Sequence, residues 1–107
     1  MAQLPADQDT IAEWGVKSDR PTTAQAMYDM GVTDVRQDIA KIGVPTTVLG
    51  SWAAYGRFGA TLESTRGIFA TQYQQLKGVD IRMSAQGYHF LMWDDAALVE
   101  KALAELL

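Results

Sequence analysis

Pro45-Thr46-Thr47-Val48-Leu49-Gly50 is the stretch that decides the fold. It is β-branched and apolar and is bounded by Pro and Gly, which is typical of a short strand covered on both faces. A long amphipathic helix is predicted after it, capped by Thr61 and closed by Gly78. Residues 79–84 then alternate polar and apolar side chains, which predicts a second strand at an edge of the sheet.

A final helix begins at Asp94 or Asp95, so the chain ends in a strand-helix-strand-helix unit. The right-handed crossover rule makes the two strands parallel, and their carboxyl ends then share one rim. Ser51 and His89 follow the two strands and fall on that rim. Open α/β sheets bind their ligands there.

The first 44 residues read as short helices with polar breaks, and one of them carries a predicted buried face at Ala26, Met27 and Met30. The expected helices run from Asp7 or Asp9 to Gly15, from Thr22 or Thr23 to Gly31, and from Thr33 or Asp34 to Gly43. We therefore expect an N-terminal helical segment over residues 1–44 and a βαβα unit over residues 45–107, together forming a single α/β domain.

Composition excludes several classes of protein. The 107 residues are 48% hydrophobic and 21% charged, as in ordinary globular domains, and the net charge of −4 with scattered basic residues argues against nucleic-acid binding. Without cysteine there is no disulfide or thiolate metal site, and one histidine with scattered carboxylates gives no metal-ligand spacing. No leader, membrane span or phosphate-binding glycine loop is visible, so we expect a soluble cytoplasmic protein without a cofactor.

The only histidine lies in Gly87-Tyr88-His89-Phe90, between the second strand and the last helix. Rigid elements on both sides fix such a loop, and a near-neutral pKa lets an imidazole there move protons. Alternatively, His89 is a half-buried loop residue that packs on Phe90 and Trp93.

Two segments in this order resemble the C-terminal half of the α/β-hydrolase superfamily. Ile42-Gly43-Val44-Pro45-Thr46-Thr47-Val48-Leu49-Gly50 is similar to the segment that enters the family's penultimate strand, and Gly87 to Phe90 followed by Trp93-Asp94-Asp95 resembles the loop that carries its catalytic histidine. The resemblance implies a truncated hydrolase-like βαβα unit, with residues 14–30 corresponding to the end of the family's cap region.

The family's activity is acyl transfer by a serine, a histidine and an acid, and only His89 can be carried over by position. The chain has no G-x-S-x-G nucleophile elbow, and residues 51–60, where the family commonly has an aspartate, contain no carboxylate. Three explanations stay open: a minimal hydrolase with a different nucleophile, a subunit whose serine comes from another polypeptide, or a non-catalytic relic that folds and associates.

Ser51 is the leading candidate nucleophile, because it leaves a strand at a tight Gly50 turn on the rim that carries the histidine. Ser84 is a weaker candidate. Asp94 and Asp95 are the candidate acids, although one of them is expected to cap the last helix. Glu63 is a further carboxylate, better explained as a first-turn residue favoured by the helix dipole.

Aromatic and apolar side chains cluster on the two rim loops. They are suited to a small acyl or aryl ester, or else they pack a dimer interface or the N-terminal helices. The expected substrate-binding residues are Trp52, Tyr55, Tyr88, Phe90 and Trp93, with Phe58 and Met92 beside them.

A two-stranded parallel sheet is a poor independent unit, and the apolar edge of Thr46–Gly50 would be bare. We expect a homodimer that pairs this edge with its copy and so completes the sheet. The sequence thus predicts a serine-type carboxylic ester hydrolase of low activity, with His89 as general base, Ser51 as nucleophile, and Asp94 or Asp95 as orienting acid. The alternative is a non-catalytic interaction module, or a subunit that completes a split α/β-hydrolase.

Overall fold

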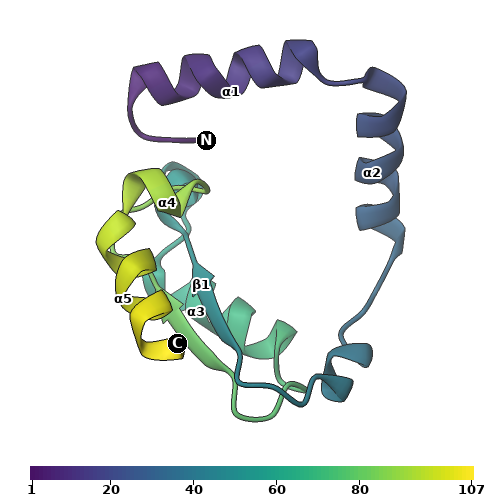
Figure 1. Cartoon of the computed structure of the whole chain (residues 1–107), viewed down its shortest axis with the longest axis vertical. Coiled ribbons are helices and arrows are strands. Elements are labelled where there is room, and N and C mark those ends of the chain that lie inside the picture. The colour runs from purple at the N-terminus through teal and green to yellow at the C-terminus, as the bar shows by residue number, and fades with distance from the viewer.

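A computed structural model describes all residues from 1 to 107 (Figure 1). It contains helices around a small two-stranded parallel sheet, so the predicted small α/β architecture is confirmed at this level. The helices are α1 (Pro5–Lys17), α2 (Arg20–Val32), η1 (Asp38–Lys41), η2 (Ala53–Phe58), α3 (Leu62–Gln72), α4 (Leu91–Asp94) and α5 (Ala96–Leu106), where η marks a 3₁₀-helix. The strands are β1 (Thr47–Gly50) and β2 (Asp80–Met83).

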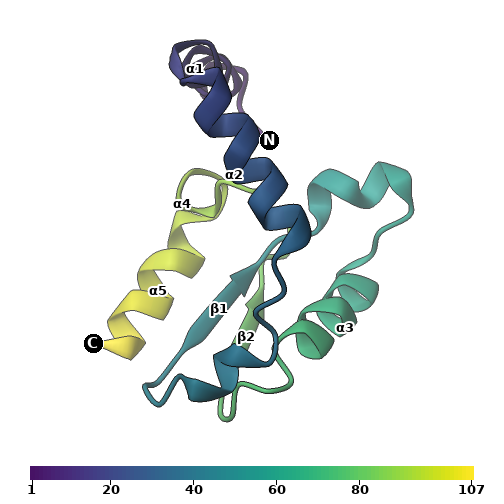
Figure 2. The same cartoon turned by 90° about the vertical axis from the view of Figure 1, so that its right-hand side faces the viewer.

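The sheet lies between two helices, with α5 over one face and α3 over the other (Figure 2). Thr47 pairs with Asp80 and Gly50 with Met83 in a parallel register. Side chains alternate between the faces of a strand. Thr47 and Leu49 accordingly line an apolar hollow against α5. Parallel pairing brings the carboxyl ends of both strands to one rim, as the sequence predicts.

Gly50 faces α3, where no side chain would fit. A Cβ at this position would lie 2.6 Å from Met83 Sδ and 3.1 Å from Phe69 Cζ. On the opposite face, Arg82 pairs with Asp80 of its own strand and with Glu105 of α5. These ion pairs link β2 to α5, and the hydrogen bonds that Arg82 donates to Asp80 and Glu105 raise the pKa of its guanidinium above the usual value.

Two of the predicted helix starts are confirmed. Thr61 caps α3, where its side chain and that of Ser64 form a reciprocal capping box. Asp95 caps α5 by accepting a hydrogen bond from the Leu98 backbone N–H. The residues just before it form the extra short helix α4, which the sequence did not indicate.

The N-terminal boundaries differ from the prediction. Leu4, rather than an aspartate, precedes α1, and Asp19, rather than Thr22 or Thr23, caps α2. In both helices a proline lies in the first turn, where its missing N–H costs no hydrogen bond. The predicted stops at Gly15 and Gly31 lie inside the helices. A glycine inside a helix lowers its stability by only about 1 kcal/mol relative to alanine, so it does not have to end the helix. In place of the predicted third helix there is only the four-residue η1.

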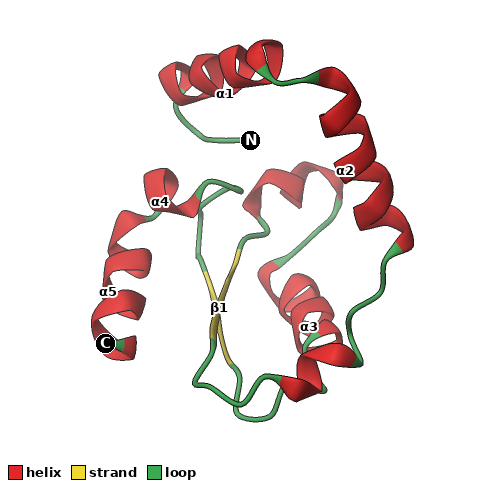
Figure 3. Cartoon of the chain, turned by 45° about the vertical axis from the view of Figure 1, so that its right-hand side comes forward, coloured by secondary structure: helices red, strands yellow, loops and turns green.

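The segment α1–α2 runs around an opening beside the sheet rather than lying on it (Figures 1 and 3). Every residue of α2 is exposed, so the predicted buried face at Ala26, Met27 and Met30 has no partner within the chain. No helix is both long and apolar enough to cross a membrane.

Candidate functional site

The carboxyl rim of the sheet carries the loop that follows β2, and this loop is held by a buried serine. Ser84 is only 1% exposed. Its hydroxyl donates a hydrogen bond of 2.6 Å to Asp95 Oδ2 and accepts one of 2.8 Å from the Gly87 backbone N–H. A Cβ on Gly87 would lie 2.8 Å from this hydroxyl and 2.6 Å from Leu91 Cδ2. The serine therefore locks the loop that presents the histidine.

Asp94 holds the other side of the loop. Its Oδ2 accepts a hydrogen bond of 3.0 Å from the Tyr88 N–H, and its Oδ1 accepts one of 3.0 Å from the Gln3 N–H. The carboxylate thereby connects the histidine loop to the N-terminal residues. Asp95 is engaged by Ser84 and by the helix cap, and no hydrogen bond joins either aspartate to His89.

His89 is exposed, and its imidazole forms no hydrogen bond. Its backbone N–H donates to the Met1 carbonyl at 3.1 Å, and its ring meets Phe90 edge-on with centroids 5.4 Å apart. Ser51 is half-buried just after β1, and its hydroxyl is likewise without a partner. The topology thus brings Ser51 and His89 to the same rim without joining them by a hydrogen bond.

A cavity of about 560 Å³ lies between η2, the N-terminal residues and the histidine loop. Tyr55 and Phe58 of η2 line it together with Tyr88. Of the expected substrate-binding residues, Tyr55 and Tyr88 therefore border a pocket of suitable size for a small ligand.

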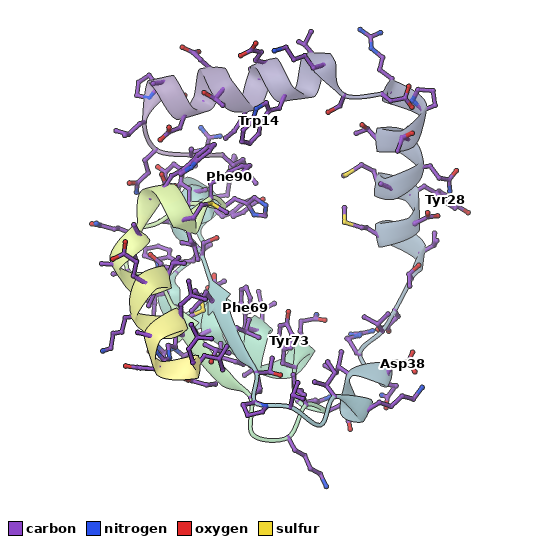
Figure 4. All side chains as sticks on the ribbon, in the orientation of Figure 1. Trp14, Tyr28, Asp38, Phe69, Tyr73 and Phe90 are labelled. Carbon is purple, nitrogen blue, oxygen red and sulfur yellow. The ribbon has the colours of Figure 1, made fainter.

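The other three expected residues lie elsewhere. Phe90 and Trp93 stack with ring centroids 5.1 Å apart, and Trp14 of α1 packs on Trp93 at 5.5 Å. Figure 4 shows Trp14 beside Phe90, with ring centroids 6.4 Å apart. This is the packing against the N-terminal helices that the sequence left open as an alternative. Trp52 is not among the residues that line the cavity, and its indole Nε1 is buried without a hydrogen-bond partner.

Arg57 is a pocket residue that the sequence analysis missed. It lines the same cavity, and its guanidinium lies 4.8 Å from the centroid of the Phe58 ring. The sequence does place this arginine among aromatic residues in a rim loop, and that pattern could have predicted its place in the pocket because guanidinium groups stack on aromatic rings. It is the one cationic side chain lining the cavity, and it suits a ligand with an anionic or carbonyl oxygen.

No group of three His, Asp or Glu side chains is arranged to hold a metal ion. Compared with known proteins, the chain matches no protein family, no curated protein and no solved structure. The hydrolase resemblance therefore rests on residues 42–50 and 87–95 alone, and the roles given to Ser51, His89 and the two aspartates stay predictions.

Proposed function

We propose that the chain provides the histidine-bearing part of a serine-type ester hydrolase, with His89 as general base. The observation that carries the proposal is the combination of a free, exposed imidazole with a loop locked on both sides by Ser84 and Asp94. A catalytic base needs a fixed mounting and an available nitrogen, and this loop provides both. The neighbouring Tyr88 places the loop beside the cavity.

In this mechanism His89 accepts the proton of a serine hydroxyl as the oxygen attacks the ester carbonyl, and returns it to the leaving alcohol, which leaves an acyl-serine. Water that gives a proton to His89 then attacks the acyl-serine, and the return of this proton to the serine oxygen releases the carboxylic acid. Ser51 is the proposed nucleophile, because its hydroxyl is unengaged on the same rim. Asp94 and Asp95 are both proposed as the orienting acid, and either one would have to release a hydrogen bond that now organises the loop. We expect low activity because a preorganised oxyanion hole usually supplies the largest part of acyl-transfer catalysis.

The cavity defines the substrate class of the proposal. Tyr55, Phe58 and Tyr88 offer apolar surface to an acyl or aryl group, and Arg57 offers a cation to an ester oxygen. A short activated ester fits this composition better than a long acyl chain, given a volume of about 560 Å³ that the N-terminal residues partly enclose.

Hydrolysis of p-nitrophenyl acetate by the purified chain tests the proposal. We expect His89→Gln and Ser51→Ala each to reduce the rate above background at least tenfold, whereas Ser18→Ala, an exposed helix-end hydroxyl, leaves it unchanged. A serine-directed fluorophosphonate should label Ser51. Equal rates in all four proteins, with no labelling, would contradict the enzymatic reading.

The second candidate function is a non-catalytic interaction module, or the subunit that completes a split α/β-hydrolase. Two observations favour it: both candidate acids are engaged in bonds that organise the loop, and both strands have an unpaired edge. In this reading the nucleophile comes from another polypeptide, or a copy of the chain pairs along the edge of Thr46–Gly50. The isolated chain would then be inert to the fluorophosphonate.

A further inference from the structure

The segment α1–α2 is anchored at both ends. At its beginning Ala2 is buried, the Gln3 N–H donates to Asp94, and Trp14 packs on Trp93. At its far end the chain returns to the sheet, where Val35 and Ile39 border a cavity of about 360 Å³ against α3. The two helices therefore form an arch fixed to the body at both feet (Figure 3). We call this segment, residues 5–32, the arch.

Helix α2, on one side of the arch (Figure 1), carries exposed apolar side chains. Met27 is 62% and Met30 68% exposed, and three positions apart they share one face of α2. Tyr28 points away from the opening (Figure 4) and lies roughly 130° around the helix from the methionine face. An isolated helix of 13 residues is marginal in water. Every residue of α2 is exposed, so this face is open to contact with another molecule.

The chain exposes more surface than a compact monomer of its mass. A folded monomer of 11.7 kDa exposes roughly 5,900 Å², whereas this chain exposes 7916 Å². Its radius of gyration is 15.6 Å, against about 13 Å for a compact domain of this length. The excess is about 2,000 Å² per chain, and a contact that buried it in two copies would cover about 4,000 Å², an area typical of obligate homodimers.

We propose that a second copy of this chain covers the arch, and that the two copies dock reciprocally. The methionine face of α2 from each copy enters the cavity of the other, whose lining includes Val35, Ile68, Phe69 and Tyr73. The rings of Phe69, in α3, and Tyr73, at its C-cap, stack on each other and face the opening (Figure 4). Thioether side chains adapt to such irregular apolar hollows and contact aromatic rings favourably. Reciprocal docking about a twofold axis closes the assembly at two copies.

This contact differs from pairing of the β1 edges. A four-residue strand is only about 13 Å long, so its pairing cannot bury an area of this size. The arch offers thirteen residues in each helix and the largest exposed apolar side chains of the N-terminal segment. Substitutions on α2 therefore distinguish the two contacts, because they leave the β1 edge intact.

Sedimentation equilibrium tests the proposal with a matched pair of variants. We expect dimers for the natural chain and for Tyr28→Glu, whose side chain is 65% exposed on the opposite face of α2. The double variant Met27→Glu/Met30→Glu should weaken dimerisation at least a hundredfold. A natural chain that is monomeric at 100 µM overturns the proposal, as does a dimer that both variants leave unchanged.

Cross-linking gives an answer even if the glutamate variant unfolds. The chain has no cysteine, so Met27→Cys in one sample and Gln72→Cys, beside the cavity, in another can be mixed and oxidised. Reciprocal docking predicts that the mixture of Met27→Cys and Gln72→Cys forms a disulfide-linked heterodimer. The mixture of Tyr28→Cys and Gln72→Cys should give at least a fivefold lower yield of linked heterodimer. Equal yields from the two mixtures overturn the assignment of the methionine face.

Discussion

Ser84 shows how one side chain organises the candidate site. Its buried hydroxyl donates a hydrogen bond to the Asp95 carboxylate and accepts one from the Gly87 amide. From the sequence, Ser84 was only the weaker of two candidate nucleophiles. A hydroxyl committed to a carboxylate at 2.6 Å and to a backbone amide is a structural group. No local pattern revealed this, because the partner lies 11 residues further along the chain.

We expect Ser84→Ala to lower the free energy of unfolding by about 1–3 kcal/mol, since it leaves a carboxylate oxygen and an amide without their partner. The control is Ser18→Ala, which removes an exposed hydroxyl and should change stability by less than about 0.5 kcal/mol. Urea denaturation measures both. Equal losses of unfolding free energy in the two variants would contradict a specific contribution from the buried hydrogen bonds of Ser84.

The pair Asp34 and Arg36 gives a prediction on pH. Hydrogen bonds from the Arg36 side chain and backbone lower the pKa of Asp34 to about 2. Because the folded pKa is depressed, any stabilisation is complete above the ordinary carboxyl pKa of about 4 and disappears as the pH falls through about 2. An NMR titration should find this low pKa, and Arg36→Gln should return it toward the ordinary value. The pair is exposed, so added salt should reduce the shift.

At the scale of elements, the sequence predicts best where local and tertiary signals agree. The apolar run of β1 and the cap at Thr61 each match the structure, because burial and turn chemistry point to the same boundary. The N-terminal helix ends were wrong because several Asp and Thr residues offer equivalent caps there, and no packing contact selects among them. The chain after Val32 has apolar residues at helical spacing, yet only η1 forms.

The open edge of β1 predicts a difference between neighbouring amides. The carbonyls of Thr46 and Gly50 accept hydrogen bonds from the amides of Asp80, in β2, and Ser84, just after it. By alternation the Val48 amide faces β2 and the Leu49 amide faces the open edge. In dilute solution the Leu49 amide should exchange with solvent deuterium at least tenfold faster than that of Val48. A rise in Leu49 protection with protein concentration would support pairing of the strand edges, and constant fast exchange would contradict it.

At the scale of the whole molecule, the sequence indicated the rim and the histidine loop but not the arch. Topology rules place His89 and Ser51 on one edge from strand order alone. The apolar periodicity of α2 predicted a buried face, but periodicity does not say which surface buries it. The arrangement of Asp94 also escaped prediction, since it depends on contact with Gln3 near the other end of the chain.

Association through the arch predicts that thermal stability depends on concentration. A partner that binds only the folded chain stabilises it by mass action, so the Tm should rise by several degrees between 2 and 200 µM. The Met27→Glu/Met30→Glu variant should show a constant Tm over the same range. Calorimetry measures both, and a constant Tm for the natural chain would contradict association through this surface.

The contact between Gln3 and Asp94 spans 91 residues, and it has a consequence for biosynthesis. Asp94 is synthesised 91 residues after Gln3, so the first foot of the arch has no loop to bind until that later segment has emerged from the ribosome. Until then, helices α1 and α2 are connected to the rest of the chain at one end only. Neighbouring chains on the same polysome could exchange these helices in that interval, before either one closes on itself.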